Sequence, residues 1–177
     1  MEYILKNGKT VNIRKPVADD AAAIINLISV ADTETKFLAR NPGEFSVTVE
    51  QEKNFIGDIL KDDDSEWFVA EYDREIIGMC SVGLVGKTER FRHRAEVTFV
   101  ILQDYCGIGI GGKLMQSCIS WCRGKGIRQI ELDVVSENKR AIDMYEGFGF
   151  KTTGIIPKAM RYPDGTFADK KFMVLEL

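Results

Sequence analysis

Hydrophobic and polar positions along this chain follow two periods, and the changes between them predict its secondary structure. Alternation of apolar and polar residues predicts strands, whereas apolar residues three or four positions apart predict helices. The strand pattern covers residues 10–14, 66–72, 75–85, 94–102, 129–135, 150–155 and 171–177. The helical pattern covers residues 19–28, 48–60, 109–123 and 138–148.

The order of these elements predicts the fold class. Thr48 and Gln51 form a capping box at the start of the second helix, whose buried side is expected to hold Phe55, Ile56 and Ile59. The complete order is β-α-α-β-β-β-α-β-α-β-β. It favours one mixed α/β (α+β) domain over residues 1–177, with a mostly antiparallel sheet and one parallel crossover around the third helix.

Composition and charge narrow the classes of partner. The chain has 177 residues, of which 45% are hydrophobic and 29% charged, and its formal net charge is −3. These values are typical of a globular protein and argue against a nucleic-acid partner. No apolar run approaches the length of a membrane span, and the first residues lack the pattern of a signal peptide. A cytoplasmic location without membrane association is therefore expected.

The cysteines and the single histidine argue against a metal centre. The four cysteines Cys80, Cys106, Cys118 and Cys122 form no C-x-x-C pair, and His93 is the only histidine. Such a set offers too few metal ligands at useful spacing, so no metal is expected and the cysteines are interpreted as reduced thiols of the core. His93 lies among Arg90, Arg92 and Arg94, a basic group interpreted as a solvated hairpin loop.

The segment between the strand at 94–102 and the third helix is rich in glycine. It contains Gly107, Gly109, Gly111 and Gly112. Glycines at such a junction leave main-chain N–H groups exposed at the positive end of the helix dipole. The pattern therefore predicts a binding site for a phosphate group.

Two common phosphate-binding motifs fit this segment poorly. Gly107, Gly109 and Gly112 have the spacing of the dinucleotide fingerprint, and Asp133 follows at the end of the next strand. However, only residues 113–177 remain for the rest of a doubly wound sheet, four residues separate the strand from the first glycine, and the upstream strands form a hairpin. A P-loop is excluded because Lys113 is followed by leucine instead of serine or threonine.

Two blocks of sequence resemble the GNAT superfamily of N-acetyltransferases. They are AEVTFVILQDYCGIGIGGKLM at residues 95–115 and IELDVVSENKRAIDMYEGFGF at residues 130–150. The element order of nearly the whole chain is similar as well. The resemblance implies transfer of an acetyl group from acetyl-CoA to a primary amine, by direct attack in a ternary complex. The acceptor would be a small amine, a polyamine or a protein amine. Dimers are common in the family, so a homodimer is one assembly to expect.

The resemblance also implies which residues contact acetyl-CoA. The pantetheine arm would pair with the main chain of Phe99, Val100 and Ile101, and the Ile101 amide would polarise the acetyl carbonyl. Asn138 would bind the arm further along. The pyrophosphate would lie on the N–H groups of Cys106, Gly107, Ile108, Gly109, Ile110, Gly111, Gly112 and Lys113.

One position departs from the family pattern, and one feature of the sheet is implied by it. Cys106 stands where the family usually has arginine or glutamine, and it is interpreted as a small loop residue or as a reactive thiol near a helix start. The family opens its sheet between two neighbouring parallel strands. The same divergence is expected here between the strands at 94–102 and 129–135.

Catalytic roles follow from the same resemblance, each beside a simpler interpretation. Tyr145 would give a proton to the leaving thiolate, although it could merely pack between helix and sheet. Asn138 could serve only as a helix N-cap. Glu96 would take the proton of the amine through a water molecule, or it is a surface carboxylate. Glu131 and Asp133 alternate onto one strand face and could line the acceptor side, which the loops 35–46 and 159–170 would flank.

Three functions therefore remain open from the sequence alone. The first is an acetyl-CoA-dependent N-acetyltransferase. The second is an NAD-type oxidoreductase built on the glycine fingerprint. The third is a non-catalytic module that binds acyl-CoA.

Overall fold

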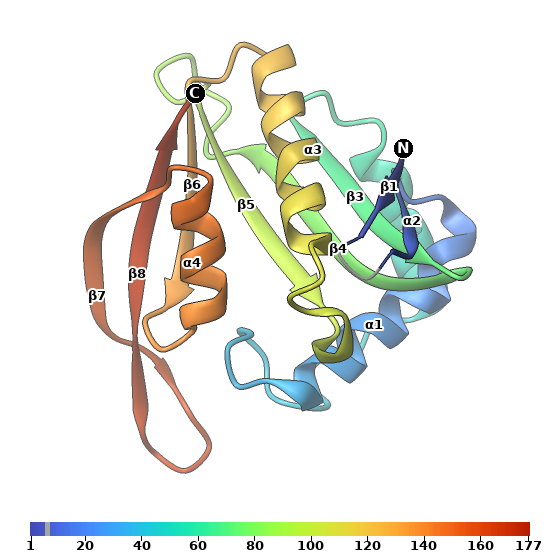
Figure 1. Ribbon diagram of the computed structural model, residues 1–177, viewed down its shortest axis with the longest axis horizontal. Coiled ribbons are helices and arrows are strands. Elements are labelled where there is room, and N and C mark those ends of the chain that lie inside the picture. The colour runs from blue at the N-terminus through green and yellow to red at the C-terminus, as the bar shows by residue number, and fades with distance from the viewer. Residues whose placement is uncertain (6–7) are drawn as a thin grey trace.

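An eight-stranded sheet forms the centre of the computed structural model, which describes residues 1–5 and 8–177 (Figure 1). The strands are β1 (Glu2–Ile4), β2 (Thr10–Arg14), β3 (Ser65–Tyr72), β4 (Glu75–Leu84), β5 (Arg94–Ile101), β6 (Gln129–Val135), β7 (Lys151–Arg161) and β8 (Phe167–Glu176). The helices are α1 (Ala21–Glu34), α2 (Val49–Ile59), α3 (Ile110–Gly124) and α4 (Lys139–Gly147), with single turns η1 (Ala18–Asp20) and η2 (Gln103–Tyr105). In space the strands are ordered β1-β2-β3-β4-β5-β6-β8-β7, and only β5 and β6 pair in parallel.

The predicted fold class and element order are confirmed, with three differences in extent. A short first strand, β1, pairs with β2 and is too brief to produce an alternating pattern. Helix α1 continues to Glu34, because Ala31 and Asp32 extend its buried side beyond Ile28. The last two strands are longer than predicted, since β7 runs to Arg161 and pairs with β8 as a long hairpin.

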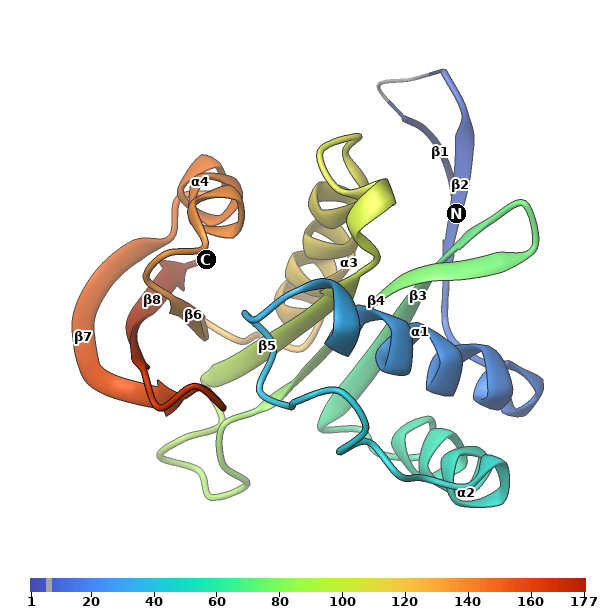
Figure 2. The ribbon, with the colours of Figure 1, turned by 90° about the horizontal axis from the view of Figure 1, so that it is seen from below.

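Helices cover both faces of the sheet (Figure 2). One core lies under α3 and α4, and includes Leu114 and Ile142. The other lies under α1 and α2, and includes Ile24 and Ile56. The predicted burial of Phe55 is wrong: its side chain is 52% exposed, and its ring meets the Trp67 ring edge-on at 5.5 Å. Position 55 lies at the margin of the inward face, whose centre is Ile56.

The cysteines of the first core are free thiols. Cys80 on β4 and Cys118 on α3 are buried, and their Sγ atoms lie 3.3 Å apart. Burial raises the pKa of the Cys122 thiol to about 12 and that of Cys80 well above its ordinary value. Thiols with raised pKa values are poor nucleophiles at neutral pH, so Cys80 and Cys122 act as packing residues. Cys118 is buried in the same core.

The predicted divergence of the two parallel strands is confirmed. β5 and β6 pair only from Arg94 to Glu96 on one side and from Gln129 to Glu131 on the other. β5 stays paired with β4 as far as Ile101, while β6 turns away with β8 (Figures 1 and 2). The far edge of β5 is therefore left without a strand partner over its second half.

An ion pair bridges the two strands where they still pair. The Arg94 guanidinium contacts both carboxylate oxygens of Glu131, with Nη2 at 2.7 Å from Oε2. Burial opposes the charge of Glu131, but hydrogen bonds from Arg94 and Gln129, together with the Arg94 charge, lower the pKa of this carboxyl. Arg94 therefore belongs to the frame of the sheet, and its interpretation as part of a solvated loop is wrong.

Replacing Arg94 by leucine should destabilise the protein by about 2 kcal/mol at pH 7, because a buried carboxylate would lose its counter-charge. A lowered folded pKa contributes stability that is present above the ordinary value of 4.5 and lost as the pH falls through the folded value. The difference between variant and wild type should therefore shrink at pH 4. Urea denaturation at both pH values measures it. Lys125→Leu is the control, because its partner Asp63 is fully exposed. Equal losses in both variants would contradict the role of Arg94.

Candidate functional site

The open edge of β5 presents main-chain polar groups to the gap beside β6. The N–H of Leu102 donates to the carbonyl of Ile77 at 3.0 Å, on the β4 side. Successive residues of a strand direct their N–H and C=O groups to opposite edges. The main-chain N–H and C=O groups of the even-numbered residues of β5 therefore point to β4. Those of Val97, Phe99 and Ile101 point into the gap.

This alternation divides the three residues predicted to contact the cofactor arm between the two edges of β5. Phe99 and Ile101 direct their main-chain groups into the gap. Val100 pairs with Met79 of β4, and its side chain packs against the core under α1 and α2. The main chain of Val100 is thus already engaged, and the available groups at this edge come from the two residues beside it.

A run of free amides connects this edge to the start of α3. Among the described residues, the N–H groups of residues 107–112 donate no hydrogen bond to the protein. Gly107 and Gly109 have φ values of +82° and +108°, which side chains rarely allow. At Gly111 a Cβ atom would lie 2.7 Å from Met144 Sδ and 3.3 Å from Ile101 Cδ1. The glycines therefore shape the loop and let the first turn of α3 approach both β5 and α4.

Two of the eight amides predicted for phosphate binding are already engaged. The N–H of Cys106 donates to the Gln103 carbonyl at 3.1 Å, and that of Lys113 donates to the Gly109 carbonyl at 3.2 Å. Six consecutive amides at the positive end of a 15-residue helix remain available. The Cys106 thiol, which is half-buried, points back toward the Leu102 carbonyl at 3.6 Å.

Tyr145 of α4 lies across the gap from β5. Its ring is 6.1 Å from the Phe99 ring and 5.7 Å from the Phe150 ring, and the residue is 7% exposed. Burial, reinforced by the negative charge of Asp133, raises the pKa of its phenol above the ordinary value. Its hydroxyl makes no hydrogen bond within the described part of the chain. Tyr145 thus packs between helix and sheet and, at neutral pH, holds a proton that it can donate.

Asn138 has the cap role that the sequence allowed. Its Oδ1 accepts a hydrogen bond from the Ala141 N–H at 3.3 Å, at the first turn of α4. Its Nδ2 group has no acceptor among residues 1–5 and 8–177, and the side chain is half-buried. The cap therefore leaves a donor available near the gap.

The three predicted carboxylates have different surroundings. Glu131 is held by Arg94, and Asp133 forms an ion pair with Lys170. Glu96 is exposed and has no ion pair in the described structure. It is aligned with Glu131 at the last paired position of β5 and β6. Of these three carboxylates, Glu96 alone has no ion pair in the described part of the chain.

A cavity of about 460 Å³ lies between the connection from α1 to α2 and the hairpin of β7 and β8. These are the two segments predicted to flank the acceptor. The Glu34 carboxylate accepts from the Gln103 N–H at 2.8 Å, and Lys36 pairs with Glu137 at 2.8 Å. Both contacts join the connection to the ends of β5 and β6, so the cavity opens at the same end of the sheet as the gap.

The charged groups that line this cavity were not predicted from the sequence. Asp32 is buried at the end of α1, and Arg40 donates to its two oxygens at 3.0 and 3.3 Å. Eight residues separate the two positions, and only the turn of the connection brings them together. An ion pair between an acidic and a basic residue four positions apart on one helix can be predicted from the sequence. The pair of Asp32 and Arg40 could not, because it depends on the course of a loop.

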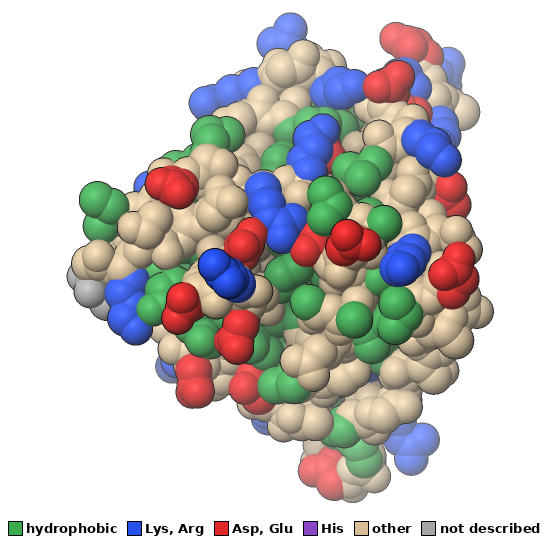
Figure 3. Space-filling view, turned by 90° about the vertical axis from the view of Figure 1, so that its right-hand side faces the viewer, with side chains coloured by type: hydrophobic (Ala, Val, Ile, Leu, Met, Phe, Trp, Pro, Cys, Tyr) green, Lys and Arg blue, Asp and Glu red, His purple; other side chains and the backbone are tan. Residues whose placement is uncertain are grey.

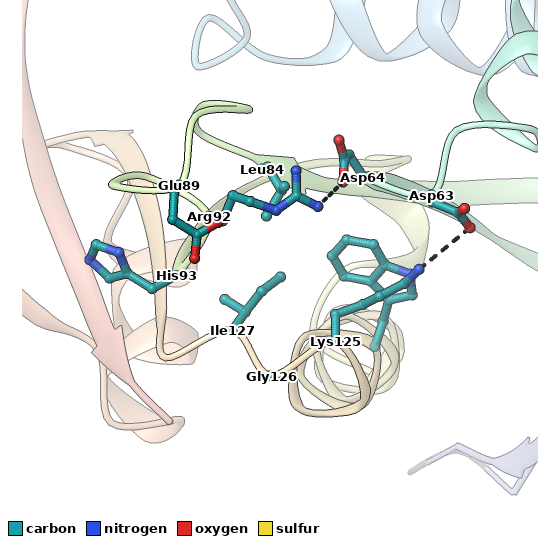
Figure 4. A pocket seen from close by; sticks show the side chains of 10 residues that line it. Asp63, Asp64, Leu84, Glu89, Arg92, His93, Lys125, Gly126 and Ile127 are labelled. Atoms are coloured by element: carbon teal, nitrogen blue, oxygen red, sulfur yellow. Dashed lines mark hydrogen bonds and ion pairs between the residues drawn. The ribbon is translucent and has the colours of Figure 1, made fainter.

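A second cavity, of about 430 Å³, lies at the opposite end of α3 (Figure 4). Arg92 pairs with Asp64 at 2.7 Å and Lys125 with Asp63 at 3.6 Å across it. Four of the charged side chains that line it are therefore engaged in ion pairs with one another. On the side of the molecule to the right in Figure 1, basic and acidic side chains are interspersed (Figure 3).

The described residues include neither a membrane-spanning helix nor a cluster of metal ligands. No helix in this part of the chain is long and apolar enough to cross a membrane. No group of three or more His, Cys, Asp or Glu side chains within it is placed to hold a metal ion.

Comparisons with known proteins agree with the fold. Residues 30–150 match the acetyltransferase (GNAT) family. An uncharacterised N-acetyltransferase of Methanocaldococcus jannaschii is 30% identical over 106 residues, which cover 58% of this chain and 46% of that protein. The L-methionine sulfoximine/L-methionine sulfone acetyltransferase of Pseudomonas aeruginosa is 29% identical over 103 residues, which cover 58% of this chain and 59% of that one. The chain thus aligns with only about half the length of these relatives.

Solved structures share nearly the whole fold. A GNAT acetyltransferase of Streptococcus pneumoniae has a TM-score of 0.89 at 24% identity, covering 94% of this chain and 99% of that one. A Salmonella typhimurium protein solved with its cofactor acetyl-CoA has a TM-score of 0.82 at 23% identity, covering 94% of each chain. The ribosomal-protein-alanine N-acetyltransferase of Brucella melitensis has a TM-score of 0.81 at 23% identity, covering 94% and 99%.

Proposed function

Because this chain belongs to the acetyltransferase (GNAT) family, we propose that it transfers an acetyl group from acetyl-CoA to a primary amine. The observation that carries the proposal is the run of six unpaired amides at the start of α3, directly beside the open edge of β5. A diphosphate needs several N–H donors and a positive helix end, and an amide-bearing arm needs an unpaired strand edge. Both lie next to each other in this fold.

The residues of the chain would divide the binding of acetyl-CoA among three places. The amides of residues 107–112 would hold the pyrophosphate. The main chain of Phe99 and Ile101 would pair with the amides of the pantetheine arm as an added strand does. Asn138 would donate from Nδ2 to the same arm. Acetyl-CoA itself supplies an activated thioester.

Tyr145 and the edge of β5 would serve the chemical step. An N–H group of β5 that faces the gap, from Ile101 or Phe99, would donate to the acetyl carbonyl as negative charge develops on its oxygen. The Tyr145 phenol would donate its proton to the departing sulfur. Direct attack by the amine needs no covalent enzyme intermediate, so the buried thiols have no role in it.

Glu96 would accept the proton of the attacking amine through water. In Glu96→Gln the amine must lose its proton unaided, so turnover should fall at least tenfold at pH 7 and approach wild type as the pH nears ~10, where an alkylamine deprotonates by itself. The pH–rate profile with a fixed amine measures this. Glu75→Gln, another exposed carboxylate at a strand end, is the control. A constant ratio between variant and wild type across pH would contradict the assignment.

Two other functions, an NAD-type oxidoreductase and a non-catalytic acyl-CoA-binding module, can be tested with the same reagents. The NAD-type alternative is disfavoured because a doubly wound sheet is parallel, whereas β5 and β6 are the one parallel pair of strands among the described residues. Thermal stabilisation by NAD instead of acetyl-CoA would overturn our proposal. Release of free CoA thiol over a panel of amines separates an enzyme from a non-catalytic acyl-CoA-binding module. The names of two similar proteins motivate including both amino-acid derivatives and peptides with N-terminal alanine.

A further inference from the structure

We propose that the cavity between the α1–α2 connection and the β7–β8 hairpin binds a carboxylate of the acceptor. The acceptor class is then small amino acids, whose amine lies next to a carboxylate, and not polyamines. This inference rests on the proposed acetyl transfer, and it adds the chemical identity of the amine.

The charges that line the cavity favour an anion. Three basic side chains line it, Lys36, Arg40 and Arg161, against one acidic side chain, Asp32. Arg40 is engaged with Asp32, whose side chain is 1% exposed. Lys36 is paired with Glu137, so Arg161 is the one cation of the lining that has no ion pair in the described structure. Its charge gives the cavity an excess of positive charge in a chain whose net charge is −3.

Tyr162 adds a hydrogen-bond donor that the protein does not use. Tyr162 lines the cavity, and its buried hydroxyl has no partner within the described structure. The Lys36 ammonium lies 5.2 Å from the centre of its ring. A buried hydroxyl without a partner costs about 1–3 kcal/mol, a cost that a bound acceptor oxygen would remove. An arginine without an ion pair and a tyrosyl hydroxyl beside one space are typical donors for a carboxylate.

An irregularity of β7 directs these groups to the cavity. The register between β7 and β8 shifts between Ile156 and Met160, and Lys158 has a φ of +51°. The Lys158 N–H donates to the Asp169 carboxylate at 2.8 Å, which holds the bend. A bulge of this kind turns the end of a strand and redirects its side chains. The segment 159–163 lines the cavity after this shift, while Met160 and Arg161 remain paired with Ala168 and Phe167 of β8.

Size and position support a small acceptor. About 460 Å³ lies within the range of small-molecule sites. The connection that lines the cavity is joined to the end of β5, where the acetyl group would lie, by the contact of Glu34 with Gln103. A carboxylate bound by Arg161 and Tyr162 would leave the adjacent amine free to point to the gap. A polyamine would bring only positive charge into the same space and would be repelled.

The test compares each amino acid with its own carboxamide. Release of CoA thiol is measured with a panel of L-amino acids, the matching amino acid amides, and spermidine. We expect kcat/KM to be at least tenfold higher for the acids than for the amides. This result would be informative because the amides have less basic amines, which alone would make them react faster.

Substitutions of residues that line the cavity test whether the preference for acids over amides arises there. Arg161→Gln and Tyr162→Phe should each lower the ratio of acid to amide at least fivefold, mainly through KM, and Arg161→Lys should restore part of it. Arg161 is exposed, so its replacement leaves the core intact. Arg90→Gln is the matched control, since Arg90 is an exposed arginine of the connection between β4 and β5 at the other end of the sheet.

Each outcome has a separate meaning. Absence of CoA release with every amine would overturn the proposed function and this inference with it. Release that is equal for acids and amides, or fastest with spermidine, would overturn the inference and leave acetyl transfer standing. An acid preference that Arg161→Gln and Arg90→Gln lower equally would also overturn it.

Discussion

Replacing Gly109 with alanine is expected to weaken acetyl-CoA binding at least tenfold, which corresponds to about 1.4 kcal/mol. Gly109 has a φ of +108° directly before the first residue of α3. Alanine must either accept a strain of about 1–3 kcal/mol or rotate to negative φ, which turns the neighbouring amides out of their common direction. Isothermal titration with acetyl-CoA measures the loss.

Gly126→Ala is the matched control for this variant. Gly126 follows the other end of α3 with a φ of +71°, and at both glycines a Cβ atom would meet nothing within 4 Å. The two variants should therefore lose similar stability through backbone strain alone. Only the variant at the start of α3 should lose affinity. Equal affinity of both variants for acetyl-CoA would show that the amides of residues 107–112 do not hold the pyrophosphate.

The glycine loop was predictable because its signal is local. A positive φ and a close approach of backbone each favour glycine, and both occur at the start of α3 between residues 107 and 112. The same holds for the capping box, where the Thr48 side chain accepts from the Gln51 N–H at 3.2 Å. The Asn138 cap is a third local signal.

Features that depend on contacts between residues far apart in the chain could not be predicted from the sequence. The strand pattern stops at residue 155, well before β7 ends at Arg161, because nearly every residue of this edge strand is exposed and burial imposes no alternation on it. The partners Arg94 and Glu131 are 37 residues apart, so a strand arginine could not be told from a loop arginine beside it. Arg161 and Tyr162 reach the cavity through a bulge that depends on Asp169. The acceptor side was therefore located only as two loops, without its chemistry.

Tyr145→Phe is expected to lower kcat about 100-fold while leaving the affinity for acetyl-CoA within about threefold. The phenylalanine ring keeps the contacts with Phe99 and Phe150, and the lost hydroxyl has no hydrogen bond within the described part of the chain. Stability should change little for the same reason. Release of CoA thiol that is slowed to this extent while acetyl-CoA still binds tightly would show that the variant lacks only the proton donor.

The pH dependence of the wild type provides the second half of this test. Because burial raises the pKa of Tyr145, its phenol stays protonated through the range in which an ordinary tyrosine, with a pKa of about 10, begins to ionise. The wild type should therefore show no fall in kcat from loss of this proton below pH 10. Full turnover in Tyr145→Phe would remove Tyr145 as the acid and leave it as a packing residue. A falling limb near pH 8 that disappears in Tyr145→Phe would instead show that its pKa is lowered in the working complex, contrary to what its burial between α4 and β5 requires.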